Sequence, residues 1–278
     1  MQSQSESRHV TVIRPMRRWE FIDLKEYREY GDLFYYLVWR NIKVLYAQTI
    51  LGFAWAILNP FFQIVIFTVI FGRVAQISTD GVPYVLFATV AIIPWTYISE
   101  AMTQSSESLV AGQGMLGKIY YPRMFFPLTP VLAKLADFGI SLLLLVGVLF
   151  YYQVSPTWNL LLLPIFFVQM VCIPAGIGLW LSALAIRYRD VRFAMPFLVR
   201  MLIYSAPILY TASSIPTNYR LVYSLNPIVS VVEGYRSCLL GTPFEWLYIL
   251  PGMIATVVLV FTGAFYFRKM ERVFVDVI

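Results

Sequence analysis

Long apolar runs alternate with short segments rich in basic residues along most of this chain. A helix needs about 20 mostly apolar residues to cross ~30 Å of hydrocarbon, and six runs reach or approach that length. They lie near residues 50–73, 82–103, 124–151, 157–186, 193–212 and 246–267. The pattern predicts an all-α integral membrane protein with six transmembrane helices.

Two further stretches predict helical segments that do not cross the membrane. Phe34 to Tyr46 mixes aromatic residues with Arg40 and Lys43, which is typical of a helix lying in the membrane interface. Leu221 to Val232 is apolar but short, and an Asn-Pro pair interrupts it. It therefore predicts a re-entrant or surface hairpin on the extracytoplasmic side.

The composition agrees with a chain that has lipid as its main solvent. Charged residues make up 13% of the sequence, whereas soluble domains carry about 25%. Aromatic residues reach 17%. We interpret most of them as belts at the membrane surface, and an aromatic surface that contacts a ligand is the alternative.

Basic residues are distributed unequally between the two sides of the predicted bundle. Sixteen lysines and arginines precede the first run, follow the second and fourth runs, or follow the last one, against three on the opposite side. The positive-inside rule then predicts an inner-membrane protein with both termini in the cytoplasm. Because topology accounts for the net charge of +6, no nucleic-acid partner is expected. The first run begins near Ile50, too deep for a cleavable signal peptide.

The sequence offers little material for catalysis or metal binding. His9 is the single histidine, and Cys172 and Cys238 have no metal-ligand spacing. The segment Gly112 to Ile119 resembles a phosphate-binding loop, but it ends in isoleucine where Ser or Thr must bind magnesium. We therefore expect a chain that is not an enzyme, with no catalytic residue, no metal site and no cofactor of its own.

Two opposite charges lie inside the third predicted span. Lys134 and Asp137 are three residues apart, so they share one face of a helix and can neutralise each other. Charged side chains inside a membrane usually face protein or water because exposure to lipid is costly. A structural pair and a role in transport both remain open.

A set of short motifs, in order along the chain, resembles the permease subunits of ABC-type exporters of O-antigen and related lipopolysaccharide polysaccharides. The motifs span nearly the whole chain from about Leu33 onward. They are Arg40–Tyr46, Gln48–Pro60, Ile93–Trp95, Ser105–Leu109, Lys118–Arg123, Ala185–Arg192, Asn226–Pro227, Glu233–Arg236 and Phe267–Arg272. The resemblance implies a cytoplasmic tail (1–32) followed by one transmembrane domain (33–278).

The resemblance also implies partners and residue roles. The chain would form a homodimer, bind two copies of a separate ATPase subunit that holds ATP and Mg, and export a polyprenyl-pyrophosphate-linked polysaccharide. A coupling helix to the ATPase would include Gly114, Leu116, Lys118, Ile119 and Tyr120. The lipid-pyrophosphate entry would include Arg40, Lys43 and Tyr46. An extracytoplasmic gate would include Asn226, Pro227, Glu233 and Arg236.

Three other interpretations compete with this one. A related permease would export capsule or teichoic-acid polymer instead. A polyprenyl-lipid glycosyltransferase or phosphotransferase would need clustered acids for a metal, and the loops carry only scattered ones. An ion-coupled carrier would show inverted repeats and ionisable groups at mid-membrane, where only Lys134 and Asp137 qualify.

Overall fold

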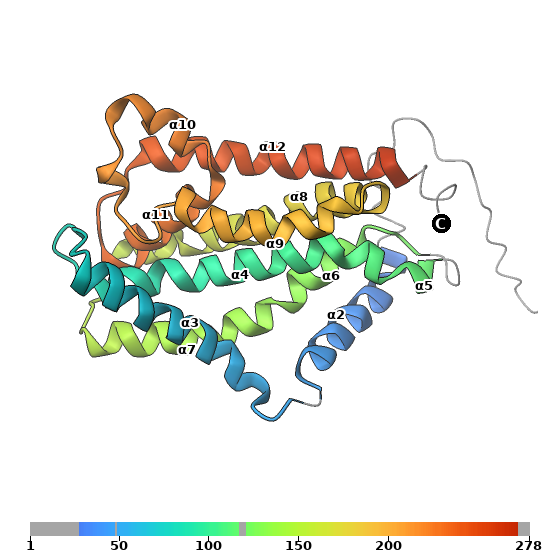
Figure 1. The fold of residues 1–278 in the computed structure, drawn as a ribbon, viewed down its shortest axis with the longest axis horizontal. Helices are drawn as coiled ribbons and strands as arrows, with labels where there is room; N and C mark the ends of the chain where they lie inside the picture. Colours follow the sequence, from blue (N-terminus) through green and yellow to red (C-terminus); the bar gives the residue numbers. More distant parts are fainter. Residues whose placement is uncertain (1–27, 48, 117–120, 272–278) are drawn as a thin grey trace, which may run out of the picture.

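The structure, a computed structural model, describes residues 28–47, 49–116 and 121–271. Every regular element within these ranges is a helix. Figure 1 shows the long helices lying side by side in a bundle, with α10 and α11 gathered at one end. The all-α expectation is confirmed for this part of the chain.

Five helical stretches are long and apolar enough to cross a membrane: Gly52–Val74, Tyr84–Ala111, Phe125–Tyr151, Trp158–Arg187 and Trp246–Glu271. They contain η1 (Gly52–Ala54), α3 (Trp55–Phe67), the π-helical η2 (Thr68–Val74), α4 (Tyr84–Ala111), α6 (Phe125–Ala133), α7 (Leu135–Tyr151), η3 (Trp158–Leu162), α8 (Leu163–Arg187) and α12 (Trp246–Glu271). Five of the six expected spans therefore form as membrane-length helices.

Helix α4 is the central element of the fold. It packs against α3, α6, α7, α8, α9 and α11, and 78% of its most apolar window is buried inside the chain. It also continues well past its expected end near residue 103. The added turns contain the buried residues Ser105, Ser106 and Leu109. Ser105 packs against Gly178 of α8, and its Oγ donates to the carbonyl of Pro127 over 2.6 Å. Residues that pack against protein do not contact lipid and can be polar. The hydropathy pattern therefore underestimated the length of this helix.

The expected span near 193–212 does not form as one continuous helix. Helix α9 (Asp190–Leu202) is followed by one 3-10 turn, η4 (Ile203–Ser205), and there the helix stops. Ala206 is extended, with φ −125° and ψ 158°. Pro207 follows it, and a proline disfavours the helical conformation of the residue before it. The prediction of a continuous fifth helix is corrected to a broken segment.

The stretch after this break contains two short 3-10 turns followed by two helices. Short turns η5 (Ala212–Ser214) and η6 (Thr217–Tyr219) lead into α10 (Arg220–Ser224) and α11 (Pro227–Leu240). Asn226 caps α11, since its Oδ1 accepts from the amide of Ile228 at 3.1 Å, and Pro227 occupies the first helical position. The Asn-Pro pair thus lies at the junction between α10 and α11.

Helices α8 and α12 approach each other closely through glycines. A Cβ placed on Gly263 would lie 2.5 Å from the carbonyl oxygen of Gly176, and one placed on Gly176 would lie 3.1 Å from the α12 backbone. Such small residues let helix backbones touch in membranes. The contact fixes α12 against the rest of the bundle.

Two elements lie at the margin of the bundle. Helix α2 (Gly31–Tyr46) packs on α6, where the rings of Phe34 and Phe125 stack at 4.6 Å between centroids. The short helix α5 (Gln113–Leu116) follows α4 directly. In Figure 1 both lie at the edge of the bundle (blue α2, green α5), away from α10 and α11.

Candidate functional site

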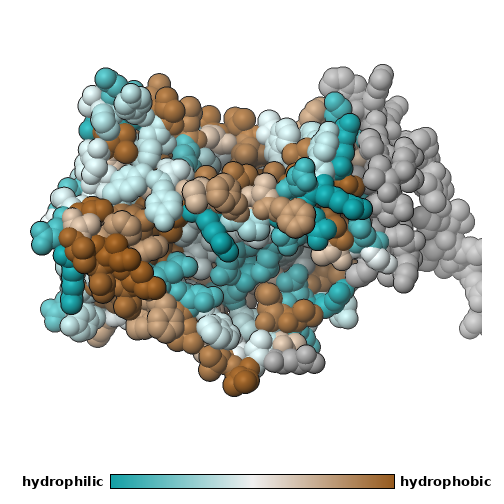
Figure 2. All heavy atoms as spheres, in the orientation of Figure 1, coloured by the Kyte–Doolittle hydropathy of each residue, from teal (hydrophilic) through white to brown (hydrophobic). Residues whose placement is uncertain are grey.

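A stripe of polar side chains runs along one face of α4. Its members are partly exposed and recur at helical spacing: Thr96, Ser99, Glu100, Thr103 and Gln104. Helices α3 and α9 both pack on α4, and Figure 2 shows hydrophilic atoms gathered in the middle of this face between hydrophobic margins. A polar stripe on a membrane helix marks a surface that meets water, a ligand or another protein, since exposure to lipid is costly.

A cavity of about 330 Å³ opens beside this stripe. Its walls come from the end of α2, the start of α3, the stripe of α4 and the junction of α6 with α7. Polar groups from Asn59, Thr96, Gln104 and Ser141 alternate in its lining with aromatic rings. Ligand sites in proteins commonly have this size and this mixed character.

Three charged residues form the most polar part of the cavity. Lys134 Nζ lies 2.6 Å from Glu100 Oε2 and 2.8 Å from Asp137 Oδ2. The expected pairing of Lys134 with Asp137 is therefore found, and Glu100 from α4 joins it. Lys134 is 6% exposed, so removal of both carboxylates would leave a buried cation without compensation. The sequence held a signal for Glu100, because it is the one acid in the buried half of α4, but its partner lies on another helix.

Only one of the three expected entry residues lines the cavity. Tyr46 does so, and its ring packs against Phe53 at 3.9 Å between centroids. Arg40 and Lys43 lie on the exposed side of α2, where Lys43 Nζ is 5.4 Å from the ring centroid of Trp39. The structure thus separates the exposed basic groups from the cavity.

The expected coupling residues fall partly outside the described ranges. Gly114 and Leu116 belong to α5, and a Cβ on Gly114 would have no atom within 4 Å. Lys118, Ile119 and Tyr120 lie outside the described residues.

At the far end of the bundle, two expected gate residues form a buried ion pair on α11. Arg236 Nη1 lies 2.8 Å from Glu233 Oε1, and its guanidinium carbon lies 3.5 Å from the ring centroid of Phe87. Burial raises the pKa of Glu233 and the nearby Arg236 opposes that rise, while burial lowers the pKa of Arg236 and Glu233 opposes that fall. Burial and the attraction between the two charges thus act on each pKa in opposite directions.

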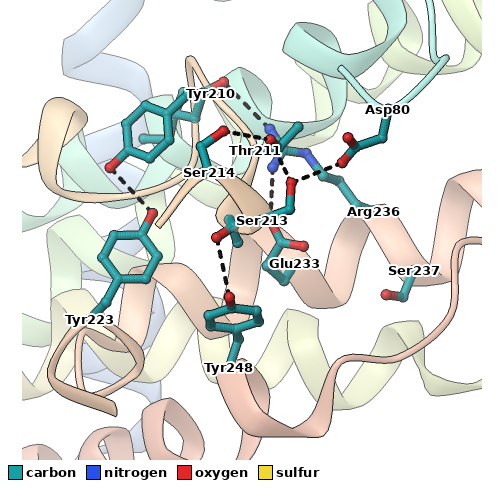
Figure 3. A network of polar contacts seen from close by, with 12 residues as sticks. Asp80, Tyr210, Thr211, Ser213, Ser214, Tyr223, Glu233, Arg236, Ser237 and Tyr248 are labelled. Carbon is teal, nitrogen blue, oxygen red and sulfur yellow. Dashed lines mark hydrogen bonds and ion pairs between the residues drawn. The ribbon is translucent and has the colours of Figure 1, made fainter. Parts of the chain in front are cut away.

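Four side chains from other elements bind the carbonyl groups that the broken helix leaves free. Figure 3 shows part of this network around Arg236 and Tyr248. The donors and their acceptors are Asn226 to Ser205 at 3.1 Å, Arg236 to Ile208 at 3.5 Å, Tyr84 to Leu209 at 3.2 Å and Tyr248 to Ala212 at 3.2 Å. Irregular backbone at membrane depth is tolerated only where protein or water satisfies it. Asn226, Glu233 and Arg236 are thus brought to one site, with Pro227 starting the helix that carries them.

Sequence reasoning missed Tyr84, Tyr248 and Asp80 as members of this network. Tyr223 Oη donates to Tyr210 Oη over 3.3 Å, and Ser213 Oγ donates to Asp80 Oδ2 over 3.2 Å. Most of these partners are more than ten residues apart in sequence, so no local pattern pointed to them. The signal that was present is Pro207, which demands some partner for the carbonyls around it.

The described residues contain no group of three or more His, Cys, Asp or Glu side chains that could hold a metal ion. The described residues thus provide two features: a polar cavity, and an irregular segment whose carbonyl groups are bound by side chains.

Comparison with known proteins identifies a family of membrane transporters. The model of the family described as "ABC-2 type transporter" matches residues 32–240. The O-antigen export system permease protein RfbA of Klebsiella pneumoniae is 25% identical over 89% of this chain and 95% of its own length. The RfbA of Myxococcus xanthus is 26% identical over 77% and 82%. The polysialic acid transport protein KpsM of Escherichia coli is 25% identical over 84% and 91%.

The family match runs from α2 through α11 and so includes both the cavity and the network around Arg236. It covers more than half of the sequence. The chain therefore belongs to the ABC-2 type transporter family, as a membrane subunit of a transporter and not an enzyme.

Proposed function

We propose that this chain is the membrane-spanning subunit of an ATP-driven exporter of O-antigen-type polysaccharide, with the glycan carried on a polyprenyl-pyrophosphate lipid across the inner membrane. The observation that carries the proposal is the polar stripe of α4, which gives a membrane bundle a surface suited to a hydroxyl-rich polymer. The likeness to the O-antigen export permeases over most of both chains supports the choice of cargo.

The broken segment serves in this proposal as the sixth crossing. Helix α9 packs against α4 and α8, and the buried residues 206–209 continue from it toward α10 and α11. Side-chain donors then replace the helical bonds that Pro207 removes. The α10–α11 pair would be the re-entrant gate, and both termini would be cytoplasmic.

A second copy of the chain covers the exposed faces of α3 and α9 in this proposal. Only 17% of the apolar window of the first span is buried within one chain. Arg200 is exposed on α9, and among the described residues no carboxylate pairs with it. A cation in a crossing segment is costly in lipid, which favours a protein or water-filled surface on this face. The polar stripes of two copies would then line a shared path.

The partner subunit supplies ATP hydrolysis. Helix α5 and the following residues 117–120 would dock on it at the cytoplasmic side. Lys118→Glu should reduce both ATPase stimulation and export, whereas Lys118→Arg should keep both. If charge reversal changes neither quantity, Lys118 has no part in coupling.

Entry of the lipid-pyrophosphate head would use the basic side of α2. Arg40→Ala should lower the export rate, and Arg40→Lys should retain more of it, because lysine also binds phosphate groups through its positive charge. Full export by a folded, partner-bound Arg40→Ala variant would remove Arg40 from the entry site.

Deletion of the chain in its source cell tests the function as a whole. Polyprenyl-linked glycan should accumulate inside the cell while surface polysaccharide disappears, and the wild-type chain should restore export. Loss of the polymer without accumulation would favour an enzyme of glycan synthesis, and unchanged surface glycan would refute export. A capsule polymer missing from the surface, with O-antigen intact, would instead favour the activity that the KpsM relatives carry in their name.

A further inference from the structure

We infer that the cavity between α2, α3, α4 and α7 is a binding site for one neutral sugar unit, and that it excludes the pyrophosphate. The inference rests on the proposed function and assigns the two chemical parts of the cargo to different surfaces. The basic side of α2 attracts the pyrophosphate, and the cavity holds sugar.

Charge is the first argument. The charged groups in the cavity lining are the carboxylates of Glu100 and Asp137 and the ammonium of Lys134, which gives a formal charge of −1. Lys134 is held by both carboxylates at 2.6 and 2.8 Å, so its charge is already balanced. A pyrophosphate entering here would meet net repulsion in a medium of low dielectric constant. A sugar bearing a carboxylate would be disfavoured for the same reason.

Hydrogen-bonding capacity is the second argument. Glu100 contacts Lys134 through Oε2, and its side chain is 34% exposed, so Oε1 can accept a hydrogen bond from a hydroxyl group. Asp137 Oδ1 and Tyr46 Oη are buried and have no partner among the described residues. The amides of Asn59 and Gln104 add donors and acceptors. Hydroxyl groups, which both donate and accept, match this mixture better than a cation or an anion does.

Shape and the aromatic lining are the third argument. Trp55 is 47% exposed and borders the cavity, so its ring can meet the apolar C–H face of a pyranose while the hydroxyls reach the acids. A hard metal cation needs about six or more oxygen ligands around a small centre. A cavity of about 330 Å³ bordered by Trp55 and Phe138 does not offer that arrangement.

The test uses the full chain in lipid nanodiscs and neutral oligosaccharide fragments released by mild acid from the surface polysaccharide of the source cell. Calorimetric titration should show binding to the wild type. Trp55→Ala and Glu100→Gln should each weaken it by about tenfold, the loss expected for one stacked ring or one charged hydrogen bond. Trp158→Ala is the matched control, since Trp158 is 89% exposed and does not line the cavity. Inorganic pyrophosphate and potassium chloride should not compete.

Four results would overturn the inference. The first is no detectable binding when the fragments are in 10-fold excess over the chain at millimolar concentration, and the second is the same affinity for Trp55→Ala as for the wild type. The third is competition by pyrophosphate for fragment binding. The fourth is that all fragments from the source cell carry carboxylates. Because Trp55 is exposed, its replacement leaves folding intact and keeps the test decisive if Glu100→Gln does not fold. The proposed function stands or falls separately, on whether deletion of the chain abolishes surface polysaccharide.

Discussion

The buried pair of Glu233 and Arg236 allows a quantitative test of the gate network. Glu233→Gln keeps the size of the side chain and one acceptor for Arg236, but it removes the charge that balances a guanidinium 4% exposed to solvent. Removing one partner of a buried ion pair costs about 3–5 kcal/mol, because the remaining charge is left unpaired. Since glutamine retains a hydrogen bond, we expect a loss near the lower limit, about 3 kcal/mol in the free energy of unfolding.

The double variant Glu233→Gln with Arg236→Met completes the argument. Burial shifts the pKa of both partners toward the neutral form, so the pair gains little over apolar side chains of similar volume. The double variant should therefore regain most of the stability lost by the single one. Arg236 also donates to the carbonyl of Ile208 at 3.5 Å, and that lost bond limits the recovery.

Equilibrium unfolding in mixed detergent micelles, followed by tryptophan fluorescence, measures these differences. Asp80→Asn is the control, because Asp80 is exposed and accepts one hydrogen bond from Ser213 in the same region. Its effect should stay within about 1 kcal/mol. Equal losses for the single and double variants, or a loss for Glu233→Gln no larger than for Asp80→Asn, would refute the reasoning.

Two further predictions concern packing and the cap. Gly263→Ala should destabilise by about 1–3 kcal/mol, since the added methyl group meets the backbone of α8, while Gly147→Ala, with open space around it, should not, and thermal unfolding compares them. Asn226→Ala should cost about 1 kcal/mol for the lost cap of α11, plus its bond to Ser205, and Asn226→Asp, which can still cap, should lose less in the same assay.

The five membrane-length helices were predictable because hydropathy reports contact with lipid. Where a segment contacts protein and not lipid, hydropathy made two kinds of error: it missed helical residues and it predicted helix where none forms. The polar turns around Ser105 belong to α4 because α6 and α8 cover them, and the apolar residues 206–209 are not helical because Pro207 interrupts the backbone. Other prolines, such as Pro94 and Pro174, lie inside continuous helices. The difference at Pro207 is the set of distant side chains that bind the freed carbonyls, and no local pattern reveals it.

In the candidate site, contacts between residues that are near in sequence were predictable, and contacts between distant helices were not. Helical spacing sufficed to pair Lys134 with Asp137, and the Asn-Pro pair sufficed to place the turn before α11. The addition of Glu100 required the packing of α4 on α6 and α7, which sequence separation conceals. The family resemblance assigned Arg40, Lys43 and Tyr46 to one entry site. In the fold they face different surroundings.

Movement of glycan in inside-out membrane vesicles tests the central claim most directly. Vesicles from the source cell expose the cytoplasmic face, so exported polyprenyl-linked glycan enters the lumen and becomes protected from periodate oxidation. The account predicts protection that requires this chain, ATP and Mg, fails with a non-hydrolysable ATP analogue, and persists when an uncoupler collapses the proton gradient. Protection without ATP, or protection lost only on adding the uncoupler, would contradict it.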